Sequence, residues 1–144
     1  MTTIYTLGYS GWKLDGIITT MERMDAILVD VRMVPRSRMA IWNRTSFQRR
    51  LGERYVWLRE LGNRNYKGGP IEIADFEIGL AKLTVLAATG KTVVLMCGCP
   101  DVNVCHRKVL AERLAKRWGA EVEHVAPPPK VKPSPVSQSP KSLF

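Results

Sequence analysis

The chain has 144 residues, the size of a single domain, and 45% of them are hydrophobic, enough to fill a core without disulfide bonds or a structural metal. Its formal charge is +9, from 22 lysines and arginines against 13 acidic residues, which favours anionic partners such as phosphates or nucleic acid. No apolar run is long enough to span a bilayer, and the first residues lack the basic stretch and apolar core of an export signal. We therefore expect a cytoplasmic protein with no membrane partner and with reduced cysteines.

The first half of the chain predicts strands that alternate with helices. Apolar residues recur at helical spacing in one segment, and another is a near-continuous apolar run, typical of a strand buried on both faces of a parallel sheet. The predicted elements in chain order are a strand over 4–8, a helix over 14–24, a strand over 26–31, a short helix over 45–52 and a strand over 55–58. The expected N-cap of the short helix is Thr45 or Ser46.

The second half continues the alternation after a loop over 61–70 that holds three glycines and no periodicity. Asp75 can cap a helix that stops at Gly90, and Gly119 ends a later amphipathic helix. The predicted elements are a helix from 76 toward Gly90, a strand over 92–96, a helix that opens at Cys105–His106 and ends at 118, and an alternating edge strand over 121–125.

These elements predict an α/β fold with three layers, in which a mainly parallel sheet of about five strands has helices on both faces. We expect residues 1–125 to form a single α/β domain. From residue 126 to 144 the composition changes to Pro, Ser and Lys, which cannot bury enough apolar surface to offset the entropy of ordering. That segment is therefore predicted to be a disordered tail.

Four polar segments follow the four predicted inner strands, and ligands of open α/β sheets bind at the carboxyl ends of the strands. The first segment contains Tyr9 and Ser10, and the third ends at Arg64. The second spans residues 30–38 and the fourth spans 97–107. We expect the four segments to meet at one edge of the sheet, with Tyr9, Ser10 and Arg64 among the ligand-binding residues.

The second segment begins with Asp30 and continues with arginines at 32, 36 and 38 around Ser37. The planar fork of arginine suits two-point contact with phosphate or carboxylate groups. One interpretation is an internal ion pair between Asp30 and Arg32 that holds the loop. That pair leaves Arg36 and Arg38 without a role, so we predict an anion site built from Arg32, Arg36, Ser37 and Arg38.

The fourth segment holds all three cysteines of the chain, at 97, 99 and 105. Cys97 ends a predicted buried strand, where a small apolar residue is common. Cys105 and His106 open a helix beside Arg107, an environment that lowers the pKa of a thiol. Cys97, Cys105 and His106 are therefore candidate catalytic residues together with Asp30, and Arg107 is a candidate anion ligand.

Two common interpretations of this cysteine pattern do not fit it. Cys-x-Cys-x5-Cys-His supplies four soft ligands, which makes zinc conceivable, but the spacing matches no common zinc finger. It also lacks the Cys-x5-Arg pattern of phosphatases that use a cysteine nucleophile. We assign no metal ligands from the sequence, and the cofactor is unknown.

The chain closely resembles the bacterial and archaeal family named domain of unknown function 488 over residues 3–125. The resemblance rests on the motifs TLGYS at 6–10, LVDVR at 28–32, PRSR at 35–38, the Leu61–Gly62 turn, Cys97 at a strand end and CHR at 105–107. It implies that the signature positions are Asp30, Arg32, Pro35, Ser37, Arg38, Cys97, Cys105, His106 and Arg107. It also implies a glutamate two residues after the first cysteine, and here that position is Cys99.

The leading functional hypothesis is an enzyme that acts on a phosphorylated ligand, either a nucleotide or a nucleic-acid component. The arginines would hold the anion, and Asp30 or His106 would move a proton. Cys97 or Cys105 would serve as the nucleophile.

Two other functions remain open. A nucleic-acid-binding module without catalysis would use the basic residues 32–50, interleaved with Trp42 and Phe47, to follow a phosphate backbone. A redox or metal-sensing domain would centre on the three cysteines. The partners predicted from sequence are thus an anionic small molecule or nucleic acid, and neither enzymatic activity nor the oligomeric state is decided.

Overall fold

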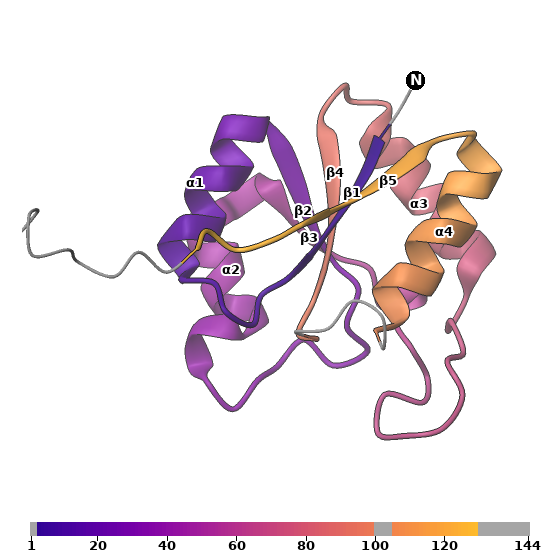
Figure 1. The fold of residues 1–144 in the computed structure, drawn as a ribbon, viewed down its shortest axis with the longest axis horizontal. Helices are drawn as coiled ribbons and strands as arrows, with labels where there is room; N and C mark the ends of the chain where they lie inside the picture. Colours follow the sequence, from indigo (N-terminus) through magenta and orange to yellow (C-terminus); the bar gives the residue numbers. More distant parts are fainter. Residues whose placement is uncertain (1–2, 100–104, 130–144) are drawn as a thin grey trace, which may run out of the picture.

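The computed structural model, which describes residues 3–99 and 105–129, contains one sheet of five parallel strands (Figure 1). The strands are β1 (Thr3–Gly8), β2 (Ala26–Asp30), β3 (Tyr55–Trp57), β4 (Thr92–Cys97) and β5 (Glu121–Val125). Their order across the sheet is β3-β2-β4-β1-β5, and each neighbouring pair is parallel. The predicted α/β class is confirmed, and β5 lies at an edge as expected.

Four α-helices cover the two faces of this sheet (Figure 1). They are α1 (Leu14–Met24), α2 (Arg44–Leu51), α3 (Phe76–Ala87) and α4 (His106–Trp118). One buried cluster joins the sheet to α1 and α2, and a second joins it to α3 and α4. The fold therefore has the three layers that the sequence predicts. Among the described residues, no helix is long and apolar enough to cross a membrane.

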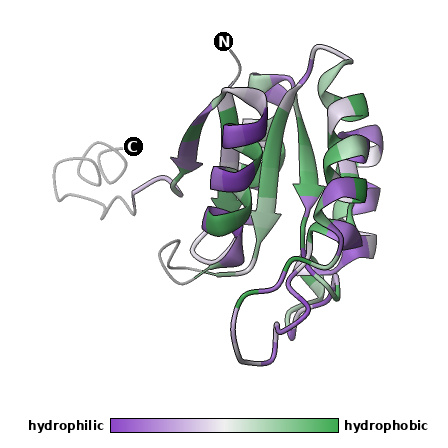
Figure 2. Ribbon diagram, turned by 90° about the vertical axis from the view of Figure 1, so that its right-hand side faces the viewer, coloured by the Kyte–Doolittle hydropathy of each residue, from purple (hydrophilic) through white to green (hydrophobic). Residues whose placement is uncertain are grey.

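The pleat of the strands decides which side chains reach which layer, because successive residues of a strand point to opposite faces. In β2, Leu28 packs toward α1 and α2, whereas Ile27 and Val29 pack toward α3 and α4. All five residues of β2 are buried, as expected for an inner strand of a parallel sheet. Figure 2 shows the inner strands mostly in green, while the helices carry both purple and green residues.

Several helix ends follow the sequence signals. Asp25 closes α1 in the left-handed conformation, with φ 48°, and Gly119 closes α4 with φ 64°. Asp75 caps α3 by accepting a hydrogen bond from the backbone N–H of Ile78. The expected N-cap of α2 was wrong. The N-cap is Asn43, whose side-chain oxygen accepts a hydrogen bond from the backbone N–H of Ser37 and so ties the preceding loop to the helix.

The sheet and its helices lie between Thr3 and Val125. Residues 126–129 follow β5 with no helix or strand. The remainder of the predicted tail, 130–144, lies outside the described residues. The division into a domain and a disordered tail therefore stays a prediction.

Candidate functional site

The segments singled out in the sequence meet at the carboxyl edge of the sheet, where a cleft of about 580 Å³ opens. Its base is the end of β4, from Cys97 to Cys99, with His106 beside it. One wall is the loop after β2, which contributes Arg32 and Arg36. The opposite wall comes from the segment after β3, which contributes Asn63, Asn65, Tyr66, Gly68, Gly69 and Ile71.

Asp30 and Arg32 form a buried ion pair behind the wall of the cleft. The Asp30 side chain is fully buried, and its two oxygens accept hydrogen bonds from Arg32 Nε at 2.8 Å and Nη2 at 2.6 Å. Tyr55 donates its hydroxyl to the same carboxylate at 2.5 Å, and Arg32 Nη1 donates to the backbone oxygen of Trp42 at 2.7 Å. The internal ion pair weighed from the sequence is thus the arrangement that Asp30 and Arg32 adopt.

Aromatic rings complete the surroundings of the Arg32 guanidinium, which lies 5.4 Å from the centre of the Tyr9 ring and 5.8 Å from that of Phe47. Burial lowers the pKa of Arg32, but the hydrogen bond and charge of Asp30 outweigh it and raise that pKa above its ordinary value. Burial and the Asp30 charge also raise the pKa of the Tyr55 phenol. Asp30 and Arg32 therefore form a charged pair, and the Tyr55 phenol beside them is neutral.

The other predicted anion ligands lie in different places. Arg36 is exposed and lines the cleft. The Ser37 hydroxyl accepts a hydrogen bond from the backbone N–H of Met39. Arg38 is exposed and does not line the cleft. Arg64 donates to the backbone oxygen of Ala74 and so braces its own segment.

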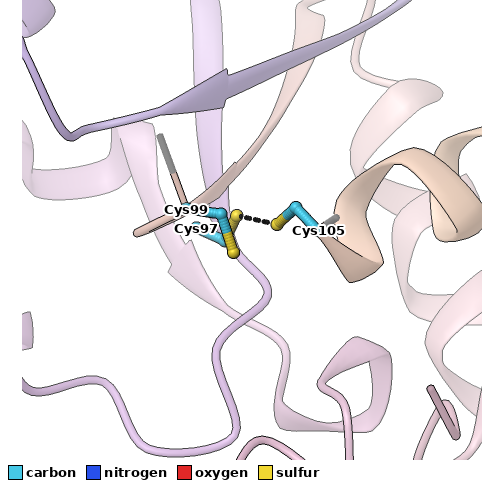
Figure 3. Close-up of side chains that lie close together, drawn as sticks. All are labelled: Cys97, Cys99 and Cys105. Atoms are coloured by element: carbon cyan, nitrogen blue, oxygen red, sulfur yellow. Dashed lines mark hydrogen bonds between the residues drawn. The ribbon is translucent and has the colours of Figure 1, made fainter. Parts of the chain in front are cut away.

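Three cysteine sulfurs gather at the base of the cleft (Figure 3). Cys97 and Cys99 come from the end of β4, and Cys105 is the N-cap residue of α4. The three Sγ atoms lie within 4.8 Å of one another, and those of Cys97 and Cys105 are 2.7 Å apart. All three cysteines are free thiols, of which Cys97 and Cys105 are buried and Cys99 is half-buried.

The cluster distributes its negative charge unevenly. The thiols of Cys105 and Cys97 stabilise the anion of Cys99, aided by the charges of His106 and Arg107, and lower the pKa of Cys99 to about 3. The pKa of Cys97 is raised by its hydrogen bonds to Cys105 and Cys99 and by burial. For Cys105, the Cys97 contact lowers the pKa, but Cys99 and burial outweigh it and raise the pKa to about 11. The sequence predicts a lowered pKa for the Cys105 thiol. In the structure the thiol with a lowered pKa is that of Cys99.

His106 and Arg107 begin α4 but face different surroundings. The ring of His106 is half-buried, its Nε2 lies 2.9 Å from the backbone oxygen of Val31, and burial lowers its pKa. Arg107 is buried and lines a separate, smaller cavity together with Ser10 and His124. The structure therefore brings Cys97, Cys105 and His106 together, and places Arg107 and Ser10 elsewhere on the same edge.

Sequence reasoning missed several residues of this site. Asn63, Asn65 and Tyr66 fall in a segment interpreted only as a loop, and the isolated bridge between Asn63 and Ile73 gives it its shape. The signal that could have found them is the run of amide and aromatic side chains directly after a strand. Tyr55 was assigned only to a strand, although strand alternation places it on the Asp30 face of the sheet.

The sequence model of the family described as Domain of unknown function DUF488 matches residues 13–114. The chain belongs to this family. The match covers the cleft walls and the cysteine cluster, and it confirms the family that the motifs indicate. No curated protein and no solved structure shows a significant match to the chain.

Proposed function

We propose that the protein is a metal-binding protein that holds a thiophilic ion, with Zn²⁺ as the reference case, on Cys97, Cys99 and Cys105. The observation that carries the proposal is the approach of the three sulfurs to within 4.8 Å of one another at the base of a cleft. Thiolates are soft ligands and select ions such as Zn²⁺ and Cu⁺ over Mg²⁺ and Ca²⁺.

The spacing of the sulfurs suits a tetrahedral ion. With Zn–S bonds of about 2.3 Å, two sulfurs of a tetrahedral site are about 3.8 Å apart. The three sulfurs lie within 4.8 Å of one another, and the Sγ atoms of Cys97 and Cys105 are 2.7 Å apart. An ion would therefore be accommodated by adjustments of about 1 Å, which side-chain rotation of the three cysteines supplies.

Three protein ligands leave one coordination position for water or a ligand, which is the arrangement of reactive rather than purely structural zinc sites. Cys97 and Cys99 both line the cleft, so we expect this position to face it. The Nε2 atom of His106 lies 2.9 Å from the Val31 carbonyl, and His106 does not belong to the group of mutually close ligand atoms. We therefore assign His106 to the surroundings of the ion and not to its ligands.

The experiment is a titration of reduced, tag-free protein with Co²⁺ and Zn²⁺, followed by the thiolate-to-cobalt absorption band and by elemental analysis. We expect one ion per chain, displacement of Co²⁺ by Zn²⁺, and a large loss of affinity in Cys97→Ser, Cys99→Ser and Cys105→Ser. Met33→Leu is the matched control, since the Met33 side chain lines the same cleft without belonging to the cluster. Reduced protein that binds neither ion would overturn the metal site and leave redox chemistry of the thiols.

A second candidate is an enzyme that acts on a phosphorylated ligand in the same cleft. It is favoured by Arg36, which is exposed, lines the cleft and has no ion pair within the described residues. Nucleotide binding that disappears in Arg36→Gln and persists in Arg38→Gln would support it. A nucleic-acid-binding module without catalysis would use Trp42 and Phe47 to stack on bases. Trp42 is 6% exposed and Phe47 is fully buried, so neither ring is available for stacking.

A further inference from the structure

We propose that a second, smaller cavity, nearer the β5 edge of the sheet, binds a small tetrahedral oxyanion such as inorganic phosphate or sulfate. The cavity has a volume of about 200 Å³ and lies between the end of β1, the first turn of α4 and the end of β5. Its polar lining residues are Ser10, Arg107 and His124. The proposal does not depend on the metal site, because no cysteine lines this cavity.

The central observation is the state of Arg107. Its side chain is 4% exposed, and its Nε and Nη1 atoms are buried without a hydrogen-bond partner among the described residues. Arg107 also forms no ion pair within residues 3–99 and 105–129. A buried charge without a hydrogen-bonding partner is strongly unfavourable. The Cys99 anion is near enough to interact with the charge of Arg107 but leaves Nε and Nη1 without a partner among the described residues, so a further negative group would stabilise the guanidinium.

Arg32 provides an internal comparison. It is also buried, at 8% exposed, but a carboxylate, a backbone oxygen and two aromatic rings surround it. Within the part of the chain that the structure describes, the buried Arg32 thus has a complete set of partners and the buried Arg107 does not. This contrast supports the proposal that Arg107 binds an anion.

The backbone at Gly8 approaches the Arg107 guanidinium closely. A Cβ atom on Gly8 would lie 3.1 Å from Arg107 Nη2 and 2.2 Å from the backbone oxygen of Cys99, so no other residue fits at this position. Gly8 also lines the cavity, which places Nη2 at its wall. Arg107 is the second residue of a 13-residue helix, and the positive end of a helix dipole adds to the attraction for an anion.

His124 and Ser10 supply further hydrogen-bonding groups from two other elements. The Nδ1 atom of His124 lies 2.5 Å from the hydroxyl oxygen of Thr6, which leaves Nε2 for a ligand. Burial and the nearby charges of Arg107 and Lys108 lower the pKa of His124, while Glu112 opposes them. An oxyanion beside Arg107 would counter this positive charge, and we expect it to raise the pKa of His124.

The two histidines of the chain make the test specific to each site, because His124 lines the anion cavity and His106 lines the cleft. Reduced protein in chelator is titrated with sodium phosphate or sodium sulfate at constant ionic strength, and the histidine ring resonances are followed by NMR. We expect a saturable shift of the His124 signals, an increase of the His124 pKa and no change at His106. Zinc is expected to shift the His106 signals instead, so the two proposals fail separately.

The variants assign the binding to Arg107. Arg107→Gln is expected to weaken phosphate binding at least tenfold, Arg107→Lys less, and Lys108→Gln, on the next residue of α4, hardly at all. If Arg107→Gln does not fold, Ser10→Ala and His124→Gln alter the exposed lining and are each expected to weaken binding several-fold. Absence of a saturable His124 shift would mean that the Cys99 thiolate alone balances Arg107, and would overturn the site. Binding lost in Arg36→Gln but kept in Arg107→Gln would overturn it in favour of the cleft.

Discussion

Asp30 has the features of a structural residue, although its place at a strand end made it a catalytic candidate. Its carboxylate is fully buried and accepts hydrogen bonds from Arg32 and Tyr55, and it does not line the cleft. A carboxylate with these partners is held in place and is not available to a ligand. Its removal would leave the Arg32 guanidinium buried without its counter-charge.

We therefore expect Asp30→Asn to lower the free energy of unfolding by about 3–5 kcal/mol, the usual result of removing one partner of a buried ion pair. Asp15→Asn is the matched control, because the Asp15–Arg50 pair is exposed and is expected to contribute about 0–1 kcal/mol. Denaturant unfolding of both variants measures the difference. Equal losses in the two variants would contradict the structural role of Asp30.

Tyr55 makes the stability of the fold depend on pH in the alkaline range. Its pKa is raised by burial and by the Asp30 charge above the ordinary value of 10.0, so the native state keeps a proton that the unfolded chain releases near pH 10. The stabilisation is complete below about pH 10 and declines as the pH rises further. At pH 8 we expect Tyr55→Phe to cost about 1.5–3 kcal/mol through the lost hydrogen bond to a charged group.

This difference between Tyr55→Phe and the parent chain should shrink steadily above about pH 10, as measured by urea unfolding at several pH values. Phenolate absorption gives an independent readout, since the raised pKa should keep the Tyr55 phenol protonated above about pH 10. Loss of phenolate absorption arising near pH 10 in Tyr55→Phe would refute the raised pKa.

At the scale of elements, α3 reaches the segment that forms one wall of the cleft through a close contact at Gly79. A Cβ atom there would lie 2.3 Å from Leu61 Cδ2 and 2.7 Å from Leu61 Cγ, and Leu61 is fully buried. We expect Gly79→Ala to destabilise the fold by about 1–3 kcal/mol, because overpacking outweighs the gain of about 1 kcal/mol in helix propensity.

Gly16 in α1 provides the matched control for this substitution. Its Cβ atom would meet the nearest side chain, Trp12, at 3.6 Å, an ordinary contact. Gly16→Ala should therefore stabilise the protein by up to about 1 kcal/mol through helix propensity alone. Thermal unfolding of the two variants should show shifts of opposite sign, and shifts of the same sign would show that the Gly79 contact has no special role.

Most of the elements could be predicted because their signals are local. Helical spacing gave the bounds of α1, and the side chain of Asp75 does cap α3. The N-cap of α2 was missed because Asn43, Thr45 and Ser46 are all good caps, and only the path of the preceding loop selects Asn43. Local sequence signals do not predict the path of that loop.

The site could be predicted only in part, since pairing between side chains depends on contacts across the fold. The sequence indicates that Cys97 and Cys105 share one edge of the sheet, but not that Cys99 turns back to join them. It proposes the Asp30–Arg32 pair without the phenol of Tyr55 that completes it. It also does not show that Arg107 is buried in a different cavity from the one that the exposed Arg36 lines. Both arginines lie in a loop or at a helix start, so their local sequence signals are alike.

At the scale of the whole molecule, the strand order explains why distant segments share one edge. β4 lies between β2 and β1, so the end of β4 is flanked by the loop after β2 on one side and by the loop after β1 on the other. The cleft opens on the β2 side and the smaller cavity lies toward β5. The formal charge of the chain is +9, and a net positive charge favours anionic partners through an attraction that weakens as salt increases.

A metal ion on the cluster would join the end of β4 to the start of α4 and so stabilise the entire fold. An ion that binds only the native state adds RT ln(1 + [L]/Kd), about 2.7 kcal/mol when free zinc is 100 times Kd. We therefore expect the thermal midpoint of reduced protein to rise with zinc concentration and to return with a chelator, as followed by circular dichroism. Magnesium should have no effect, because it prefers oxygen ligands. Cys99→Ser should abolish most of the zinc-dependent rise, measured against the zinc-free midpoint of the same variant. A zinc-dependent rise that survives in Cys99→Ser would place the ion elsewhere.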